Sequence, residues 1–359
     1  MCYYVKNILG VVFLRKKELS FVNVLLCILV MLIHICSSSV NELDKGSIFY
    51  MGIFMPWRLS AFVVQGFILL SSVKFFMGFK NKKLDYFKFI FSRIKKILIP
   101  YIISVTVYYI YFIYNNYYET FNIYELVKAI LLGNMVSHFY FVIIIFQFYL
   151  LMPLWIKMTE KIDVFIAVPF SILIMIFCHK WLPSLISIAM PSTDFIYNDR
   201  VFTSYIAYWV CGCYIGANYD KFFERIMKNK AVITLIFVVM LLGDGIFSYF
   251  NSTGALKVNF VEDIHTMYIF SAILFVLMFG KLFGEKIMDS FTLLRGVDSL
   301  SFYIYLYHCI IVYESTHYMW RHFITDLSFS FFSKFIGAYG IVFAISYVYI
   351  KFKEERKAV

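Results

Sequence analysis

The stretch NVLLCILVMLIHICSSS, residues 23–39, decides the class of protein, because it is apolar over nearly the length of a membrane-spanning helix. One imidazole, that of His34, interrupts it, eleven residues after Asn23. Further stretches of about 20 mostly apolar residues recur as far as Ile350, each long enough to cross a hydrocarbon core of roughly 30 Å. The sequence therefore predicts an all-α, polytopic membrane helix bundle.

Composition leads to the same class. The 359 residues are 62% hydrophobic and only 15% charged, whereas soluble domains are roughly 25% charged. The net charge of +11 is spread over many short loops, which argues against nucleic acid as a partner. The seven cysteines are an odd number and lie mostly within apolar stretches, so they are not expected to form a disulfide framework.

The apolar stretches predict about ten spans and both termini in the cytoplasm. With that orientation 25 of the 33 Lys and Arg fall on the cytoplasmic side, as the positive-inside rule requires. The loops are short, so we expect a single transmembrane domain over residues 1–359 without a separate extracellular domain. The predicted spans are 19–38, 56–76, 97–114, 138–156, 164–182, 201–219, 231–250, 267–283, 301–319 and 331–350.

His34 is the first candidate functional residue. An imidazole facing lipid is unfavourable, so a histidine within a span normally points into the bundle or a water-filled cavity. Eleven helical residues turn through about 1,100°, which places Asn23 and His34 on one face, roughly 16 Å apart along the axis. Cys27, Val30 and Ser37 share that face. The alternative is a histidine that only hydrogen-bonds a neighbouring helix.

Other polar residues within the spans allow two interpretations each. Ser301, Tyr305, His308 and Ser315 form one stripe that should face inward, either for function or to hold helices together. Asp244 is the one carboxylate well inside a predicted span, and it is either a proton or substrate group or a residue that bonds local backbone. The GxxxG spacing at 212–216 is typical of close helix packing.

A basic run precedes the third predicted span. One interpretation is membrane anchoring through anionic lipid, worth about 1 kcal/mol per basic residue. The other is a cytoplasmic site for a phosphorylated donor, because guanidinium and ammonium groups bind phosphate oxygens. The run consists of Lys80, Lys82, Lys83, Lys88, Arg93, Lys95 and Lys96.

Taken in order, these landmarks resemble the acyltransferase-3 family of bacterial membrane O-acyltransferases, which includes enzymes that acetylate or succinylate cell-surface polysaccharides. The similarity covers nearly the whole chain. It rests on NVLLCILVMLIH, FVVQGFILLSS, FSRIKKILIPYI, SHFYFVIIIFQFYLLMPLW, YWVCGCYIGANYDKF and SLSFYIYLYHCIIV. The resemblance implies a multi-pass protein of the bacterial plasma membrane, of about ten spans, that transfers an acyl group, usually acetyl from acetyl-CoA, to a glycan hydroxyl.

The resemblance also assigns roles to residues. His34 matches the family's central histidine, and His308 matches a histidine late in the family pattern. The family has an arginine separated from that first histidine by ten residues, where this chain has Asn23, so the charge of that arginine does not carry over. Arg93, Lys95 and Lys96 match a basic run and are the candidates for binding coenzyme A phosphates. No metal is expected, and the partners are acyl-CoA, a free or lipid-linked glycan, and membrane lipid.

The implied chemistry suits these residues. A thioester is already activated, so the enzyme must align a hydroxyl, remove its proton and stabilise the oxyanion. Burial disfavours imidazolium and would keep His34 available as general base. An acyl-histidine intermediate is the mechanistic alternative. A transporter of a glycan or lipid-linked sugar is the competing function, with His34, Asp244 and His308 along its path; the acyl group, the acceptor and the oligomeric state stay open.

Overall fold

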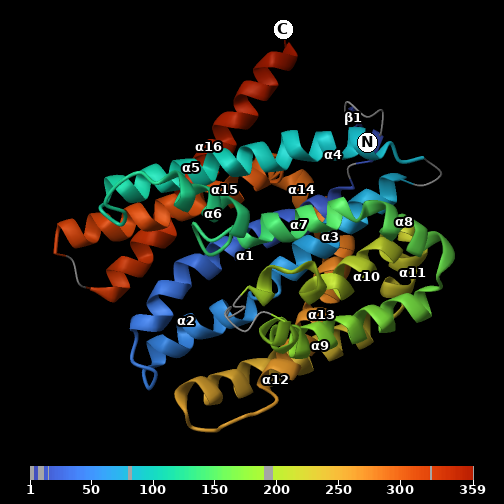
Figure 1. Ribbon diagram of the computed structural model, residues 1–359, viewed down its shortest axis with the longest axis horizontal. Coiled ribbons are helices and arrows are strands. Elements are labelled where there is room, and N and C mark those ends of the chain that lie inside the picture. The colour runs from blue at the N-terminus through green and yellow to red at the C-terminus, as the bar shows by residue number, and fades with distance from the viewer. Residues whose placement is uncertain are drawn as a thin grey trace. The chain divides into compact units, whose positions relative to one another are not determined.

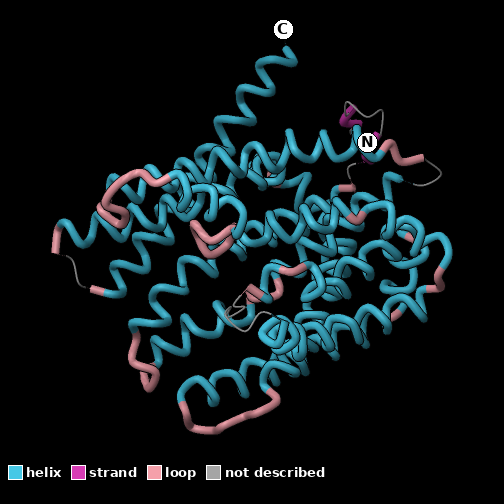
Figure 2. The backbone as a smooth tube through the Cα atoms, in the orientation of Figure 1, coloured by secondary structure: helices cyan, strands magenta, loops and turns pink. Residues whose placement is uncertain are grey.

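The computed structural model describes residues 4–6, 12–14, 16–79, 83–189, 197–323 and 326–358. Helices account for most of them, so the prediction of an all-α protein is confirmed. Figure 2 shows two very short strands, in magenta, near the N-terminus: β1 (Tyr4–Lys6) pairs antiparallel with β2 (Val12–Leu14).

The chain forms two compact units. The unit built from Arg15–Phe67 and Asp220–Val359 is called the terminal unit, and the unit built from Tyr3–Leu14 and Ile68–Tyr219 is called the central unit. The prediction of a single domain stays a prediction.

The terminal unit has α1 as its central helix. Helix α1 packs against α15, α2, η4 and α16, and α12 packs against α13. Figure 1 shows α15 and α16, coloured orange to red, running side by side. The bounds are α1 Lys17–Glu42, α2 Ile48–Leu59, α12 Lys230–Thr253, α13 Val261–Phe279, η4 Gly280–Gly284, α14 Glu285–Ser290, α15 Thr292–Arg321 and α16 Leu327–Ala358.

The central unit is also helical, and two of its elements, α4 and η1, carry Lys88, Arg93, Lys95 and Lys96 of the predicted basic run. Helix α4 leads through a π-helical turn, η1, into α5, and α4 packs against α7. Helix α3 begins among the terminal-unit residues and α11 ends among them. The bounds are α3 Val63–Phe79, α4 Tyr86–Arg93, η1 Ile94–Leu98, α5 Ile99–Tyr114, α6 Ile123–Leu132, α7 Tyr140–Leu150, α8 Met152–Lys161, α9 Val164–Ala189, η2 Asn198–Arg200, η3 Phe202–Tyr205, α10 Ile206–Ala217 and α11 Tyr219–Lys228.

All ten predicted spans fall on helices, but fewer helices meet a strict length and composition test. Within the described residues seven helices are long and apolar enough to cross a membrane, and α7 with α8, bent by 59°, makes up to eight. The other two predicted spans fall on α10 with its short 3₁₀ lead-in and on α15. Helix α15 is long enough, but its polar stripe dilutes its apolar character, which is why it fails the test.

The GxxxG spacing predicts close packing correctly. A Cβ on Gly212 would lie 2.5 Å from Leu69 O and would overlap the Ser72 side chain, and a Cβ on Gly216 would lie 2.6 Å from Val73 O. Helices α10 and α3 can therefore approach each other only because these positions lack side chains.

Helix α2 ends abruptly, and this ending positions a charged residue. Pro56 lies inside α2, and the helix stops at Leu59, before a short turn that leads into α3. The Tyr268 hydroxyl donates to Leu59 O at 2.5 Å, which satisfies a carbonyl that the helix end leaves open. Arg58 is therefore held in the last turn of α2, facing α12 and α13.

Candidate functional site

The predicted polar face of α1 packs against α15. Asn23 Nδ2 donates to Asp298 Oδ1 at 2.8 Å and to Ser301 Oγ at 2.9 Å. Asn23 and Asp298 are both buried. Cys27, one turn further along α1, lies against the Ser301 carbonyl. The face predicted from helical periodicity is thus the face that meets the polar stripe of α15.

His34 and His308 lie together at this same helix pair. Their ring centroids are 5.2 Å apart, with 52° between the ring planes. His308 is buried, with 1% exposure, whereas His34 is only partly buried. The two histidines predicted from opposite ends of the chain therefore form one pair, of which His34 is the less buried member.

The hydrogen bonds of His308 determine its tautomer. Its Nδ1 lies 3.0 Å from Ile304 O and 2.9 Å from Tyr305 O. Carbonyl oxygens only accept hydrogen bonds, so Nδ1 carries the proton. In the neutral ring Nε2 then has the lone pair, and it lies 3.4 Å from Cys309 Sγ. His308 is a buried imidazole with a fixed orientation and an accepting nitrogen.

Metal-ligating atoms also gather here. One ring nitrogen from each of His34 and His308 and the Sγ of Cys309 lie within 4.8 Å of one another. Neutral imidazole and thiolate are the ligands that zinc prefers. The expectation that no metal takes part stays a prediction.

Asp244 is the centre of a second polar cluster in the terminal unit. It is fully buried, and its Oδ2 lies 2.8 Å from His265 Nδ1. Its Oδ1 accepts from Ser248 Oγ at 3.1 Å and lies 3.5 Å from Arg58 Nη2. Of the two interpretations of Asp244 from sequence, bonding to local backbone is not what the structure shows; its partners are side chains from α2, α12 and α13.

Arg58 completes this cluster. Its Nε donates to Ser248 Oγ at 3.0 Å, and its Nη2 donates to Glu262 Oε1 at 3.2 Å. Glu262 is well exposed. A buried carboxylate with a guanidinium, an imidazole and a hydroxyl around it is a well-satisfied network of the kind that fixes helices.

The basic run divides into groups with different environments. Lys80 and Lys82 lie outside the described residues. Arg93 lies over the rings of Phe89 and Tyr149, at 4.8 and 5.0 Å, and within the described chain its buried Nε has no hydrogen-bond partner. Lys95 and Lys96, on the π-helical turn, are exposed. The run thus offers one aromatic-supported guanidinium and two accessible ammonium groups.

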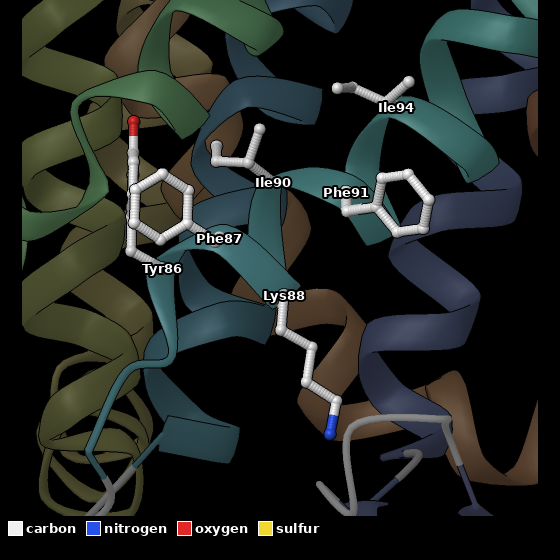
Figure 3. A pocket seen from close by; sticks show the side chains of 6 residues that line it. All are labelled: Tyr86, Phe87, Lys88, Ile90, Phe91 and Ile94. Atoms are coloured by element: carbon white, nitrogen blue, oxygen red, sulfur yellow. The ribbon is translucent and has the colours of Figure 1, made fainter.

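An open, mostly apolar groove of about 550 Å³ lies beside this run on α4. Figure 3 shows its lining, in which Lys88 extends away from the other side chains. Phe87 and Phe91 are largely exposed. The lining residues are Tyr86, Phe87, Lys88, Ile90, Phe91 and Ile94. Such a surface suits the apolar surroundings of a membrane protein.

Several residues of these sites were not found from sequence. Asp298 followed a glycine and a valine at the start of an apolar stretch, and Arg58 and His265 stood alone near the ends of predicted spans. Their partners are distant in sequence: Arg58 and Ser248 are 190 residues apart. A search for isolated ionisable residues within a few residues of the span ends would have flagged them, but not their pairing.

The helices define a multi-pass membrane protein. A family model described as an acyltransferase domain matches residues 17–351, so the chain belongs to the acyltransferase-3 family, which confirms the resemblance seen in the sequence.

Curated relatives share its length. The chain is 23% identical over 304 residues to a probable poly-beta-1,6-N-acetyl-D-glucosamine export protein of Staphylococcus epidermidis, covering 83% of this chain and 81% of that protein. A protein of the same description in Staphylococcus aureus is 25% identical over 316 residues, covering 83% and 82%. No solved structure matches.

Proposed function

We propose that this protein is an O-acyltransferase of the bacterial plasma membrane that transfers an acyl group, acetyl from acetyl-CoA, to a hydroxyl of a cell-surface or lipid-linked polysaccharide. The observation that supports this most directly is the His34–His308 pair, 5.2 Å apart between α1 and α15, in a chain of the acyltransferase-3 family. The names of the relatives add a polysaccharide of N-acetylglucosamine as a candidate acceptor.

His34 acts as the general base. As the acceptor oxygen attacks the thioester carbonyl carbon, its proton passes to His34, and the coenzyme A thiolate takes a proton back when the carbon–sulfur bond breaks. His308 orients this base. Its ring lies 5.2 Å from that of His34 and is itself fixed by two backbone carbonyls, so it limits the orientations that the His34 imidazole can take.

Asn23 takes a positioning role in this proposal. Through Asp298 and Ser301 it fixes α1 against α15 about three turns from His34, and so sets the alignment of the two imidazoles. A neutral amide there donates hydrogen bonds to a carboxylate without adding charge. The family's arginine at this position would instead form an ion pair with Asp298.

Arg93, Lys95 and Lys96 are the proposed contacts for the phosphates of coenzyme A. Arg93 has a buried Nε without a partner among the described residues and a guanidinium supported by two rings, and the two lysines are exposed beside it. The planar guanidinium of Arg93 and the ammonium groups of the two lysines together suit the oxygens of a pyrophosphate.

Export of the glycan is the second candidate, because the curated relatives are named as probable export proteins. The two functions differ in their need for an acyl donor. Purified protein in liposomes is given poly-β-1,6-N-acetylglucosamine with radiolabelled acetyl-CoA or succinyl-CoA, and label on the glycan is measured. Labelled glycan and loss of thioester support acyl transfer; uptake of glycan into the vesicles without any acyl-CoA, and no label transfer, would overturn it.

A further inference from the structure

Lys334 is a buried cation in an apolar helix. It is 2% exposed and lies in the part of α16 that is apolar enough to span a membrane. Helix α16 is fixed on α1 nearby, where Tyr339 Oη donates to Ile28 O at 2.8 Å. Lys334 is thus buried within the terminal unit, where α16 packs against α15 and α1.

The ammonium of Lys334 has little compensation. Its Nζ donates to Ser38 Oγ at 3.0 Å, and among the described residues it forms no ion pair with a carboxylate. The charge of Glu42, one turn beyond Ser38 on α1, attracts it from a greater distance. An ammonium offers three donors, and one neutral hydroxyl uses only one of them. A buried charge of this kind is unfavourable unless an anion joins it.

Ser38 relates Lys334 to the histidine pair. It follows His34 by four residues on α1, so the two side chains lie on one face of the helix, about 6 Å apart along the axis. The Lys334 ammonium is therefore about one helical turn from the imidazole that reaches substrate. A thioester carbonyl placed beside His34 would have its oxygen within reach of a long, flexible lysine side chain.

We infer that Lys334 is a catalytic residue, and that its ammonium stabilises the oxyanion formed on the acyl carbonyl. The inference rests on the proposed acyl transfer. When the acceptor oxygen bonds to the carbonyl carbon, the π electrons of C=O move to the carbonyl oxygen, and the hydroxyl proton passes to His34. Lys334 Nζ donates to that O⁻. The C=O then re-forms, the carbon–sulfur bond breaks, and the thiolate takes the proton from His34.

Stabilisation of the oxyanion explains why the Lys334 ammonium is incompletely paired. Donors that stabilise a transition state must be in place before charge develops, and a resident carboxylate would neutralise them beforehand. Ser38 holds the ammonium in position without cancelling its charge.

The test is steady-state kinetics of acetyl transfer in proteoliposomes. Lys334→Met should lower kcat by about 10²- to 10³-fold, the usual loss for one oxyanion donor, with an unchanged KM for acetyl-CoA. Lys334→Arg, which keeps the charge, should retain more activity than Lys334→Met. Ser38→Ala, which removes the anchor but not the ammonium, should lose less than tenfold.

A second measurement separates catalysis from folding. Lys334→Ala should regain part of its kcat when methylammonium or ethylammonium is added, because a small cation can occupy the vacated volume, whereas a residue needed only for packing would not respond. The inference is overturned if folded Lys334→Met keeps kcat within twofold, or if only KM changes. If the wild-type protein transfers no acyl group, it is the proposed function that fails.

Discussion

Two buried polar clusters in the terminal unit show how differently a membrane helix bundle can use ionisable side chains. The Asp244 cluster joins α2, α12 and α13, and each carboxylate oxygen has a partner: Ser248 and Arg58 on one, His265 on the other. The histidine pair joins α1 and α15, and there one imidazole meets another; His308 is buried and His34 is intermediate in exposure.

The two clusters differ in whether their ionisable groups neutralise each other. In the Asp244 cluster the charges of carboxylate and guanidinium offset each other, so the network can be retained for the sake of helix packing alone. In the pair, two backbone carbonyls fix the orientation of His308 and leave its Nε2 as the accepting nitrogen, and we propose that His34 exchanges a proton with the substrate. A charge inside a span is therefore, by itself, a weak indicator of catalysis.

The largest expected effect separates the two histidines His34 and His265. His34→Gln should lower acyl transfer by about 10²- to 10⁴-fold, the contribution of a general base, while the protein inserts and melts near the wild-type temperature. The matched control is His265→Gln, which should keep transfer per folded molecule within about threefold. Equal losses in both variants would remove the distinction between the clusters.

Asp244→Ala should act on stability instead. It leaves Arg58 partly buried without its buried carboxylate, and breaking such a pair by removing one partner costs about 3–5 kcal/mol. Thermal unfolding in detergent measures the loss, and transfer by the surviving folded fraction should stay near wild type. If stability is unchanged but the folded protein is inactive, the cluster belongs to the chemistry.

A smaller loss of stability is expected at the contact between α10 and α3, which depends on the absence of a side chain and not on an ionisable group. Gly212→Ala puts a Cβ 2.5 Å from Leu69 O, a backbone atom that cannot move aside freely, so we expect a loss of about 1–3 kcal/mol in unfolding free energy. Gly340→Ala in α16 is the control, because a Cβ there meets nothing within 4 Å. That variant should be neutral or slightly stabilised by the better helix propensity of alanine.

The smallest effect concerns the basic run. Arg93→Ala combined with Lys96→Ala should raise the apparent KM for acetyl-CoA by about tenfold, the equivalent of one charged hydrogen bond or about 1.4 kcal/mol. Lys83→Ala combined with Lys88→Ala removes the same number of charges from the same run and should change KM much less. Equal KM values in the two double variants would indicate that the run only anchors the protein.

Much of this arrangement could be predicted from residue periodicity. Apolar length located the helices, the spacing of Asn23 and His34 put both on the face that meets α15, and the paired glycines of α10 marked a close contact. The predicted number of ten spans is higher than length and composition support, because α10 is too short, and α15 too polar, to count among the seven or eight helices that could cross a membrane.

The polar contacts between helices that are distant in sequence could not be predicted. Arg58, His265 and Asp298 each stand alone in the chain, and only tertiary contact shows which side chains are their partners. Lys334 stands near the beginning of α16, where a lysine resembles an interfacial anchor whose charged end reaches water. Its burial against Ser38 is a property of two packed helices and has no signal in either one.

The most direct test of the central claim follows radiolabelled acetyl from acetyl-CoA to poly-β-1,6-N-acetylglucosamine in proteoliposomes, comparing the wild-type protein with His34→Gln and His265→Gln at equal amounts of folded protein. We expect labelled glycan from the wild type and from His265→Gln, and almost none from His34→Gln. Transfer that persists undiminished in His34→Gln would contradict it, because the His34–His308 pair would then have no part in the reaction.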